Sequence, residues 1–291
     1  MQGNKKAKLS KGEVALVAMA AVFSVVTVAL SVLPRNGNEG GFLGLLSLLT
    51  VLIFAVVHGL MRYGWKALLF FFVIVEIISN AIENLSIATG MPFGHYHYAP
   101  GVPFIFQVPF TIGLAYFAYG YLAWMVATII LDKADERFQS AYAVVLPLTA
   151  AFIMVMWDVV MDPVSSTIRH YWIWENGGGF NGVPLTNYLG WFITVYLFYQ
   201  VFALYVRRKS NVVQKRFSSR LFWATPVVIY FVTGFSYVLM YMVAANGSVT
   251  DAVGQTWNTH SIYETAAIVS MFTMTFPAFL AAVKVARSDR P

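Results

Sequence analysis

The chain has 291 residues, of which 59% are hydrophobic and 11% charged, with a net charge of +6 and no cysteine. A soluble domain carries about 25% charged residues, so this composition excludes a soluble globular protein and favours an integral membrane protein. The lack of cysteine excludes disulfides, Cys-ligated zinc and iron–sulfur clusters.

Apolar runs of about 20 residues recur along the chain, which is the length that an α-helix needs to cross a bilayer. Pro, Gly and Asn punctuate the segments between these runs. The sequence therefore predicts an all-α fold, a polytopic membrane helical bundle with residues 1–291 in a single integral membrane domain. We expect eight transmembrane helices, at residues 13–33, 41–60, 66–87, 108–131, 140–161, 186–206, 221–243 and 262–284.

The basic residues test this count, because the cytoplasmic segments of membrane proteins are rich in Lys and Arg. With the N-terminus inside, the inner segments and their helix ends hold 17 of the 19 basic residues, and only Arg35 and Arg169 fall outside. Both termini are therefore expected to be cytoplasmic, with tails at residues 1–12 and 285–291. Topology and contact with anionic membrane lipid account for the positive charge, so no nucleic-acid partner is predicted.

The acidic residues have a different distribution. Four of them fall at the outer ends of the predicted spans: Glu83, Asp158, Asp162 and Glu264. Asp135 and Glu136 are inner, but they share a short loop with basic residues and are expected to be solvated. Any chemistry is therefore expected in the outer half of the membrane.

The third span carries a polar stripe. Glu76, Asn80 and Glu83 are spaced i, i+4 and i+7, which places them on one helical face, and Asn84 borders that face. An acid near the centre of a membrane helix costs about 2.5–3.5 kcal/mol on insertion scales, so such groups face the bundle interior or a polar cavity. The stripe suits a functional site, although interhelical hydrogen bonds that only lock the bundle would need the same residues.

The loop after this span contains His95, Tyr96, His97 and Tyr98. Two His beside carboxylates suggest Zn or Fe, but the chain has only five His and lacks the His-rich boxes of membrane di-iron enzymes, so no metal is predicted. Aromatic residues crowd the outer loops. They form either an interfacial belt or a pocket for a polyene or carbocation, whose charge ring faces stabilise.

The fifth span ends with Asp158 and Asp162, which are four residues apart and share a helical face. Two carboxyl groups this close in a poorly solvated site do not both ionise easily, so the pair is expected to keep a proton. That is the arrangement a general acid needs. The alternative is structural, with Asp162 serving the loop at Pro163 and Asp158 paired with Arg169.

Two groups of motifs resemble the membrane carotenoid biosynthesis protein family. The first group contains Glu83-Asn84, Thr89-Gly90, Phe93-Gly94, Tyr96-x-Tyr98 and Gly101-Val102-Pro103. The second contains Trp157-Asp158-x-x-Met161-Asp162-Pro163, Trp172-x-Trp174, Gly182-Val183-Pro184-Leu185 and Asn187-Tyr188-x-Gly190-Trp191. The similarity runs from about Gly41 to Phe202. It implies a multi-pass protein of the prokaryotic plasma membrane.

Characterised members of that family are carotenoid end-group hydratases. The resemblance implies addition of water to the terminal double bond of an acyclic carotenoid end group, which gives a tertiary alcohol and needs no cofactor. The substrate is expected to enter from the bilayer through a slot between helices. Membrane lipids and other carotenoid biosynthesis enzymes are candidate partners.

Our hypothesis assigns the proton to the Asp158/Asp162 pair, and the water to Glu83 with help from Asn80 or Asn84. Aromatic rings are expected to flank the cation: Tyr96, Tyr98, Trp157 and Trp172. Further substrate contacts are expected from Glu76, His97, Trp174, Asn187 and Glu264.

Three other functions use the same features. One is a different polyene or prenyl-lipid enzyme, an isomerase or a transferase. Another is a non-enzymatic carotenoid- or lipid-binding membrane protein. The third is a proton-coupled transporter, which should place acids at several depths, whereas only Glu76 lies deep in this sequence.

Overall fold

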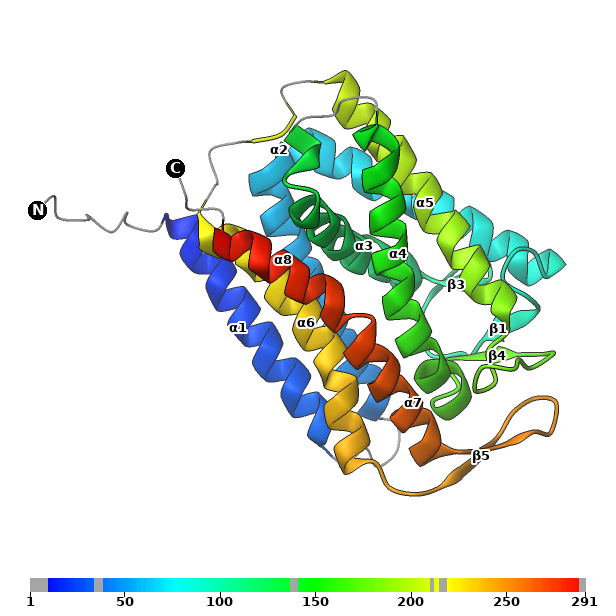
Figure 1. The fold of residues 1–291 in the computed structure, drawn as a ribbon. Coiled ribbons are helices and arrows are strands. Elements are labelled where there is room, and N and C mark those ends of the chain that lie inside the picture. The colour runs from blue at the N-terminus through cyan, green and yellow to red at the C-terminus, as the bar shows by residue number, and fades with distance from the viewer. Residues whose placement is uncertain (1–9, 34–38, 137–140, 210–211, 215–218, 288–291) are drawn as a thin grey trace, which may run out of the picture.

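The computed structural model describes residues 10–33, 39–136, 141–209, 212–214 and 219–287. Helices dominate this part of the chain (Figure 1). They are α1 (Lys11–Val32), α2 (Glu39–Thr89), α3 (Phe110–Ile130), α4 (Tyr142–Pro163), α5 (Leu185–Arg208), α6 (Arg220–Val243), α7 (Thr259–Phe272) and α8 (Thr275–Arg287). A 3-10 turn covers Ala134–Glu136, and a π-helical turn covers Val164–Ile168 directly after α4.

Seven helices among the described residues are long and apolar enough to cross a membrane, counting α7 and α8 together, which confirms the predicted all-α membrane bundle. These seven accommodate the eight predicted spans because α2 contains two of them. Gly64 interrupts α2 with φ 71° and ψ 168°, a conformation that glycine adopts easily. Beyond it the chain folds back, since a Cβ at Gly59 would lie 2.5 Å from Cδ1 of Leu68.

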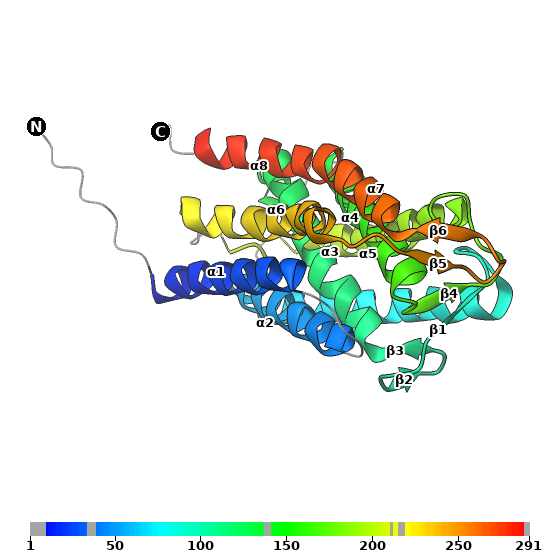
Figure 2. The ribbon, with the colours of Figure 1, turned by 90° about the horizontal axis from the view of Figure 1, so that it is seen from below.

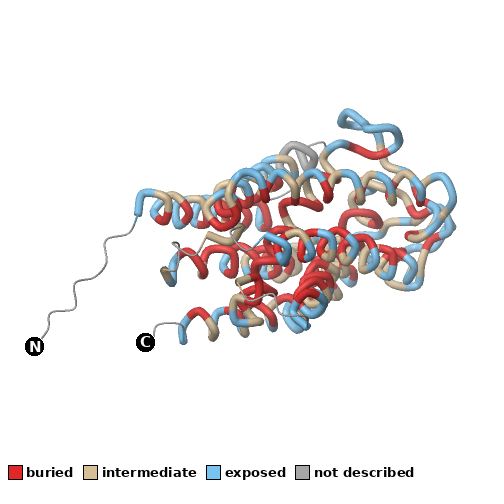
Figure 3. The backbone as a smooth tube through the Cα atoms, turned by 90° about the horizontal axis from the view of Figure 1, so that it is seen from above, coloured by how far each residue is buried: buried red, intermediate tan, exposed pale blue. Residues whose placement is uncertain are grey.

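Helix α3 lies in the middle of the bundle and contacts α2, α4, α6 and α8. Buried residues, drawn red in Figure 3, gather along the inner faces of the helices, and exposed residues lie on the outer helix faces and in the loops. The start of α1 and the end of α8 lie at one end of the bundle (Figure 1). The short β-ribbons lie at the opposite end (Figure 2). That the first of these ends faces the cytoplasm stays a prediction.

In the described part of the chain, three antiparallel ribbons join helix ends. β1 (Tyr96–Tyr98) pairs with β4 (Trp172–Trp174), β2 (Phe104–Ile105) with β3 (Val108–Pro109), and β5 (Ser248–Thr250) with β6 (Thr256–Asn258). In the first ribbon Tyr96 is opposite Trp174, and Tyr98 is opposite Trp172. Successive side chains of a strand point to opposite faces, so these four aromatic residues share one face.

The inner acids correct one expectation from the sequence. Asp135 is not solvated but only 3% exposed, and it accepts hydrogen bonds from buried Arg62 at 3.0 and 2.6 Å and from Tyr63 at 2.7 Å. Glu136 adds a 2.9 Å bond to the same guanidinium. Because an unpaired buried charge is costly, Arg62 on α2 holds the loop after α3 in place.

Candidate active site

Glu83 lies on α2, is 3% exposed, and is surrounded by tyrosine hydroxyl groups. Its Oε2 accepts a hydrogen bond from Tyr96 and a 2.9 Å bond from Tyr98, both on β1. Its Oε1 accepts a 2.8 Å bond from Tyr116 on α3. Burial and the charge of Glu83 raise the pKa of Tyr96 and Tyr98 well above their usual value. Both phenols therefore remain hydrogen-bond donors at neutral pH.

Asp158 and Asp162 are buried on α4, one turn apart. The Nδ2 of Asn187, on α5, donates to Oδ2 of both acids, at 3.1 Å for Asp158 and 2.6 Å for Asp162. Asp162 also accepts from the indole N–H groups of Trp172 at 3.0 Å and Trp174 at 3.4 Å. The Oδ1 of Asp158 is buried and has no hydrogen-bond partner among the described residues.

The β1/β4 ribbon connects the two acidic sites. One strand supplies two of the tyrosines that bind Glu83, and the other supplies the tryptophans that bind Asp162. The ring of Tyr96 lies 4.9 Å from that of Trp174, and the ring of Tyr98 lies 6.1 Å from that of Trp172. Glu83 is also within electrostatic range of both aspartates. The fold therefore brings all three predicted catalytic acids into one buried cluster, defined here as Glu83, Asp158 and Asp162.

Stacked aromatic rings form a wall beside this carboxyl cluster. Trp157 stacks on Tyr119 with ring centroids 4.2 Å apart, and Tyr116 stacks on Trp191 at the same distance. The rings of Trp157 and Trp191 meet edge to face at 6.1 Å. Ring faces carry negative electrostatic potential, so this wall suits a cation as well as a polyene chain.

The rest of the polar stripe on α2 stays apart from the cluster. Asn80 donates from Nδ2 to Oε2 of Glu76 at 3.2 Å, and that carboxyl packs so tightly on α3 that a Cβ at Gly113 would lie 2.1 Å from it. Asn84 donates to the carbonyl of Asn80 at 2.7 Å and accepts from the backbone N–H of Gln107 at 3.0 Å. The side-chain amides of Asn80 and Asn84 therefore form hydrogen bonds with α2 and the neighbouring loop, not with Glu83.

Two other predicted contacts also lie elsewhere. His97 is between Tyr96 and Tyr98 in sequence but points the other way, and its exposed ring bonds to Glu175 at 3.0 Å. The alternation of side chains along a strand explains this. Glu264 is exposed on α7, and within the described residues it forms no hydrogen bond with the carboxyl cluster.

Several residues of the site were not predicted, among them Trp191 of the aromatic wall, Tyr116 and Tyr188. Tyr116 lies in a uniformly apolar helix, where nothing in the sequence distinguishes it from other buried tyrosines. Tyr188 belongs to a motif that resembles the family, and its buried hydroxyl has no hydrogen-bond partner among the described residues. It is within electrostatic range of Asp158 and Asp162. The described residues contain no group of three or more His, Asp or Glu side chains arranged to hold a metal ion.

The family model described as carotenoid biosynthesis protein matches residues 40–256 of the chain, which include the whole carboxyl cluster. A curated relative, the bisanhydrobacterioruberin hydratase of Haloarcula japonica, is 28% identical over 124 residues. That match covers 42% of this chain and 40% of the relative, so it spans less than half of that protein's length. No solved structure matches the chain significantly.

Proposed function

Because the chain belongs to the carotenoid biosynthesis protein family, we propose that it is a carotenoid hydratase. It adds water across the terminal double bond of an acyclic carotenoid end group to give a tertiary alcohol. One C–H and one C–O bond form while the alkene π bond is lost, so substrate and water balance without an oxidant or reductant. Family membership supports a carotenoid-modifying enzyme, and the distant hydratase relative supports the finer assignment.

The observation that carries the proposal is the carboxyl cluster itself. An alkene is a poor base, so its protonation needs an acid held in a dry site, where electrostatic interactions are strong. None of the three carboxyl groups is more than 3% exposed, and no Lys or Arg bonds to them in the described part of the chain. Asp158 and Asp162 share the donor Asn187, and two buried carboxyl groups this close do not both ionise easily, so the pair is proposed to retain a proton.

The hydrogen-bond donors indicate where this proton resides. Glu83 accepts from three hydroxyl groups, and Asp162 accepts from three N–H groups. A carboxylate that accepts several donors is stabilised in its ionised form. Among the described residues Asp158 accepts only from Asn187, and its Oδ1, which has no partner there, has room for a proton. Asp158 is therefore the proposed acid, and Asp162 holds the charge that remains nearby.

Protonation leaves a tertiary cation, which water must capture. The rings of Trp157 and Trp191 are placed to stabilise it by cation–π attraction. Glu83 is the proposed base. Both of its oxygens already accept tyrosine hydroxyls, so the proton of the attacking water passes through the hydroxyl of Tyr98, the least buried of the three phenols. The unpartnered hydroxyl of Tyr188 is a candidate to bind the water or the new alcohol.

The location of the cluster suits this substrate. Glu83 and Asp162 bond to side chains of the β1/β4 ribbon, and Asn187 joins Asp158 to Asp162. This ribbon lies opposite the end of the bundle where α1 begins and α8 ends (Figure 1). We propose that this end faces outward in a prokaryotic plasma membrane, and that the apolar chain of the carotenoid reaches the cluster from the bilayer between helices. Other carotenoid biosynthesis enzymes are proposed suppliers of the substrate.

The test is expression of the full chain in a host that makes acyclic carotenoids, followed by mass analysis of the pigments. The proposal predicts a product heavier than the substrate by one water molecule. Asp158→Asn and Glu83→Gln should abolish this gain, whereas the control Glu264→Gln, which changes an exposed acid outside the cluster, should preserve it. An unchanged pigment mass with an altered absorption spectrum would indicate an isomerase instead, and an unmodified pigment that copurifies with the protein would indicate a carrier.

A further inference from the structure

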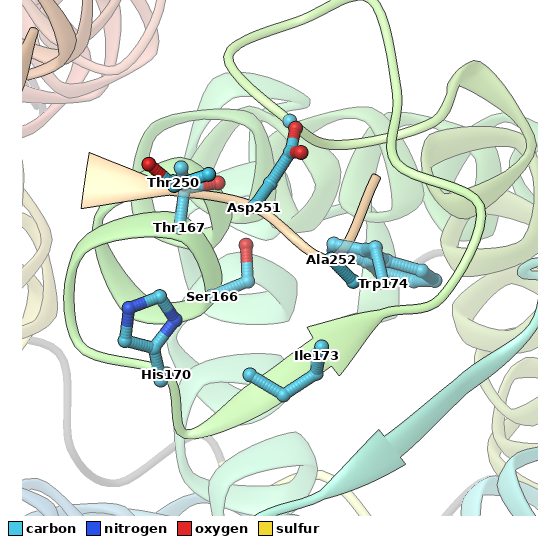
Figure 4. A pocket seen from close by; sticks show the side chains of 9 residues that line it. Ser166, Thr167, His170, Ile173, Trp174, Thr250, Asp251 and Ala252 are labelled. Atoms are coloured by element: carbon cyan, nitrogen blue, oxygen red, sulfur yellow. The ribbon is translucent and has the colours of Figure 1, made fainter. Parts of the chain in front are cut away.

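A cavity of about 250 Å³ lies at the ribbon end of the bundle, between the π-helical turn after α4 and the β5/β6 ribbon, and several polar side chains reach its largely apolar wall. Figure 4 shows side chains around it from the π-helical turn (Ser166, Thr167) and from the turn after β5 (Asp251, Ala252). His170 and Ala252 are exposed and line its outer part, whereas Ser166 and Trp174 are buried and line its inner part. The cavity therefore leads from the surface into the protein.

Only one layer of side chains separates this cavity from the carboxyl cluster. Ser166 lines the cavity and donates its hydroxyl to the backbone carbonyl of Asp162 at 2.9 Å. Trp174 lines it too, and its indole N–H lies 3.4 Å from Oδ1 of Asp162. This bond is longer than the usual 2.7–3.2 Å, so the Trp174 indole is the most weakly held donor on that carboxylate.

The π-helical turn explains why the wall is so thin. π-helical turns are rare and occur often at functional sites. Here the turn begins directly after Pro163, so the residues that follow Asp162 in the chain form the floor of the cavity. The wider turn places the hydroxyl groups of Ser166 and Thr167 at the cavity while Asp162 stays on the cluster side.

We propose that this cavity supplies the water that the reaction consumes. The Trp174 side chain is the partition between the cavity and the carboxyl cluster, and the water passes it to reach the acids. The inference rests on the proposed hydratase function, because hydration uses one water molecule for each alkene. The carboxyl cluster is closed to solvent, and a carotenoid in the bilayer brings no water with it. The cavity offers water the 2–4 polar partners that a buried water molecule needs, from Ser166, Thr167, His170 and Asp251.

The size of the cavity excludes an extended carotenoid. A water molecule takes up about 30 Å³ in the liquid, so the cavity holds several water molecules but not an extended carotenoid. The carotenoid therefore reaches the cluster by another side, and the two substrates arrive from opposite directions. This separation keeps bulk water away from the cation until the partition opens, which limits loss of the proton from the acid.

The experiment blocks the outer part of the cavity with a bulky side chain introduced on the exposed β5–β6 turn. In Ala252→Trp the new ring fills the space, and because Ala252 is exposed the fold should tolerate it. The matched control is Gln255→Trp, which adds the same ring to the same turn at an exposed position away from the cavity. We expect Ala252→Trp to lower the hydration rate about tenfold or more, as closure of a required path does, with normal pigment binding. The control should hydrate at the wild-type rate.

A second measurement separates this inference from the proposed function. Hydroxyl-radical labelling of the purified protein reports whether water reaches Trp174, whatever reaction the protein catalyses. Labelling of Trp174 should fall severalfold in Ala252→Trp and not in Gln255→Trp. If the wild type hydrates carotenoid and Ala252→Trp does so equally fast, or if the plug leaves the labelling of Trp174 unchanged, the cavity is not the water path. If the wild type adds no water but the labelling result holds, the hydratase assignment fails and the cavity still conducts water.

Discussion

The two aspartates of the carboxyl cluster should respond in opposite ways to the same substitution. Asp162 accepts three N–H donors, two at Oδ1 and one at Oδ2. An asparagine has one acceptor oxygen, so in Asp162→Asn its amide N–H₂ must face either the indoles of Trp172 and Trp174 or the amide of Asn187. One buried donor then loses its partner at about 1–3 kcal/mol, and the other bonds lose charge assistance of about 1 kcal/mol each. We expect Asp162→Asn to lower the free energy of unfolding by about 3–5 kcal/mol.

Asp158→Asn should cost far less stability. The new amide oxygen can still accept from Asn187, and the amide N–H₂ takes the place of the protonated Oδ1, which has no protein partner. An amide resembles a protonated carboxyl group in shape and in its absence of charge, so we expect a change below about 1 kcal/mol. It cannot donate the proton, however, and loss of a general acid lowers the reaction rate by about 10²–10⁴-fold.

The assay measures both quantities on the same purified variants. Unfolding in a mild detergent is followed by tryptophan fluorescence during titration with a denaturing detergent, and hydration is followed by the pigment mass. The expected pattern is a stable, inactive Asp158→Asn and a destabilised Asp162→Asn. The assignment of the proton to Asp158 is refuted if Asp158→Asn loses as much stability as Asp162→Asn, or if it still hydrates.

Three further predictions concern the surroundings of the cluster. Tyr116→Phe removes one of the three hydroxyl donors to Glu83 and should lower the free energy of unfolding by about 1.5–3 kcal/mol. The same detergent titration measures this, and no loss of stability would mean that the bond is absent in the membrane protein. Gly113→Ala should displace the Glu76 carboxyl from α3, because the new Cβ would lie 2.1 Å from it, and adding Glu76→Ala should remove this effect. A double-mutant cycle without coupling would contradict the contact. Arg62→Met leaves Asp135 and Glu136 without their ion-pair partner and should lower the free energy of unfolding by about 3–5 kcal/mol. Normal expression and thermal stability of this variant would argue against a buried ion pair.

Local sequence pattern was sufficient for the features that depend on one helix. The length of the apolar runs predicted the spans, including both halves of α2, because crossing a bilayer demands a minimum helix length. The four-residue spacing of Asp158 and Asp162 predicted a shared helical face, and in the structure both carboxyl groups accept a hydrogen bond from Asn187. The sequence shows Tyr96-x-Tyr98 and Trp172-x-Trp174 as separate motifs, but it did not predict that they pair as a β-ribbon.

Only the tertiary structure decided which of these groups meet. Glu83 and Asp162 lie on different helices far apart in the chain, and the β1/β4 register joins their networks. The same register turned His97 outward, and long-range packing buried Asp135 against Arg62 although its loop looks solvated in the sequence. The periodicity of a helix or strand determines which side chains share a face. Which face meets which neighbour depends on contacts between distant segments, and for this reason the donors that leave Asp158 with a free oxygen could not be deduced from the sequence.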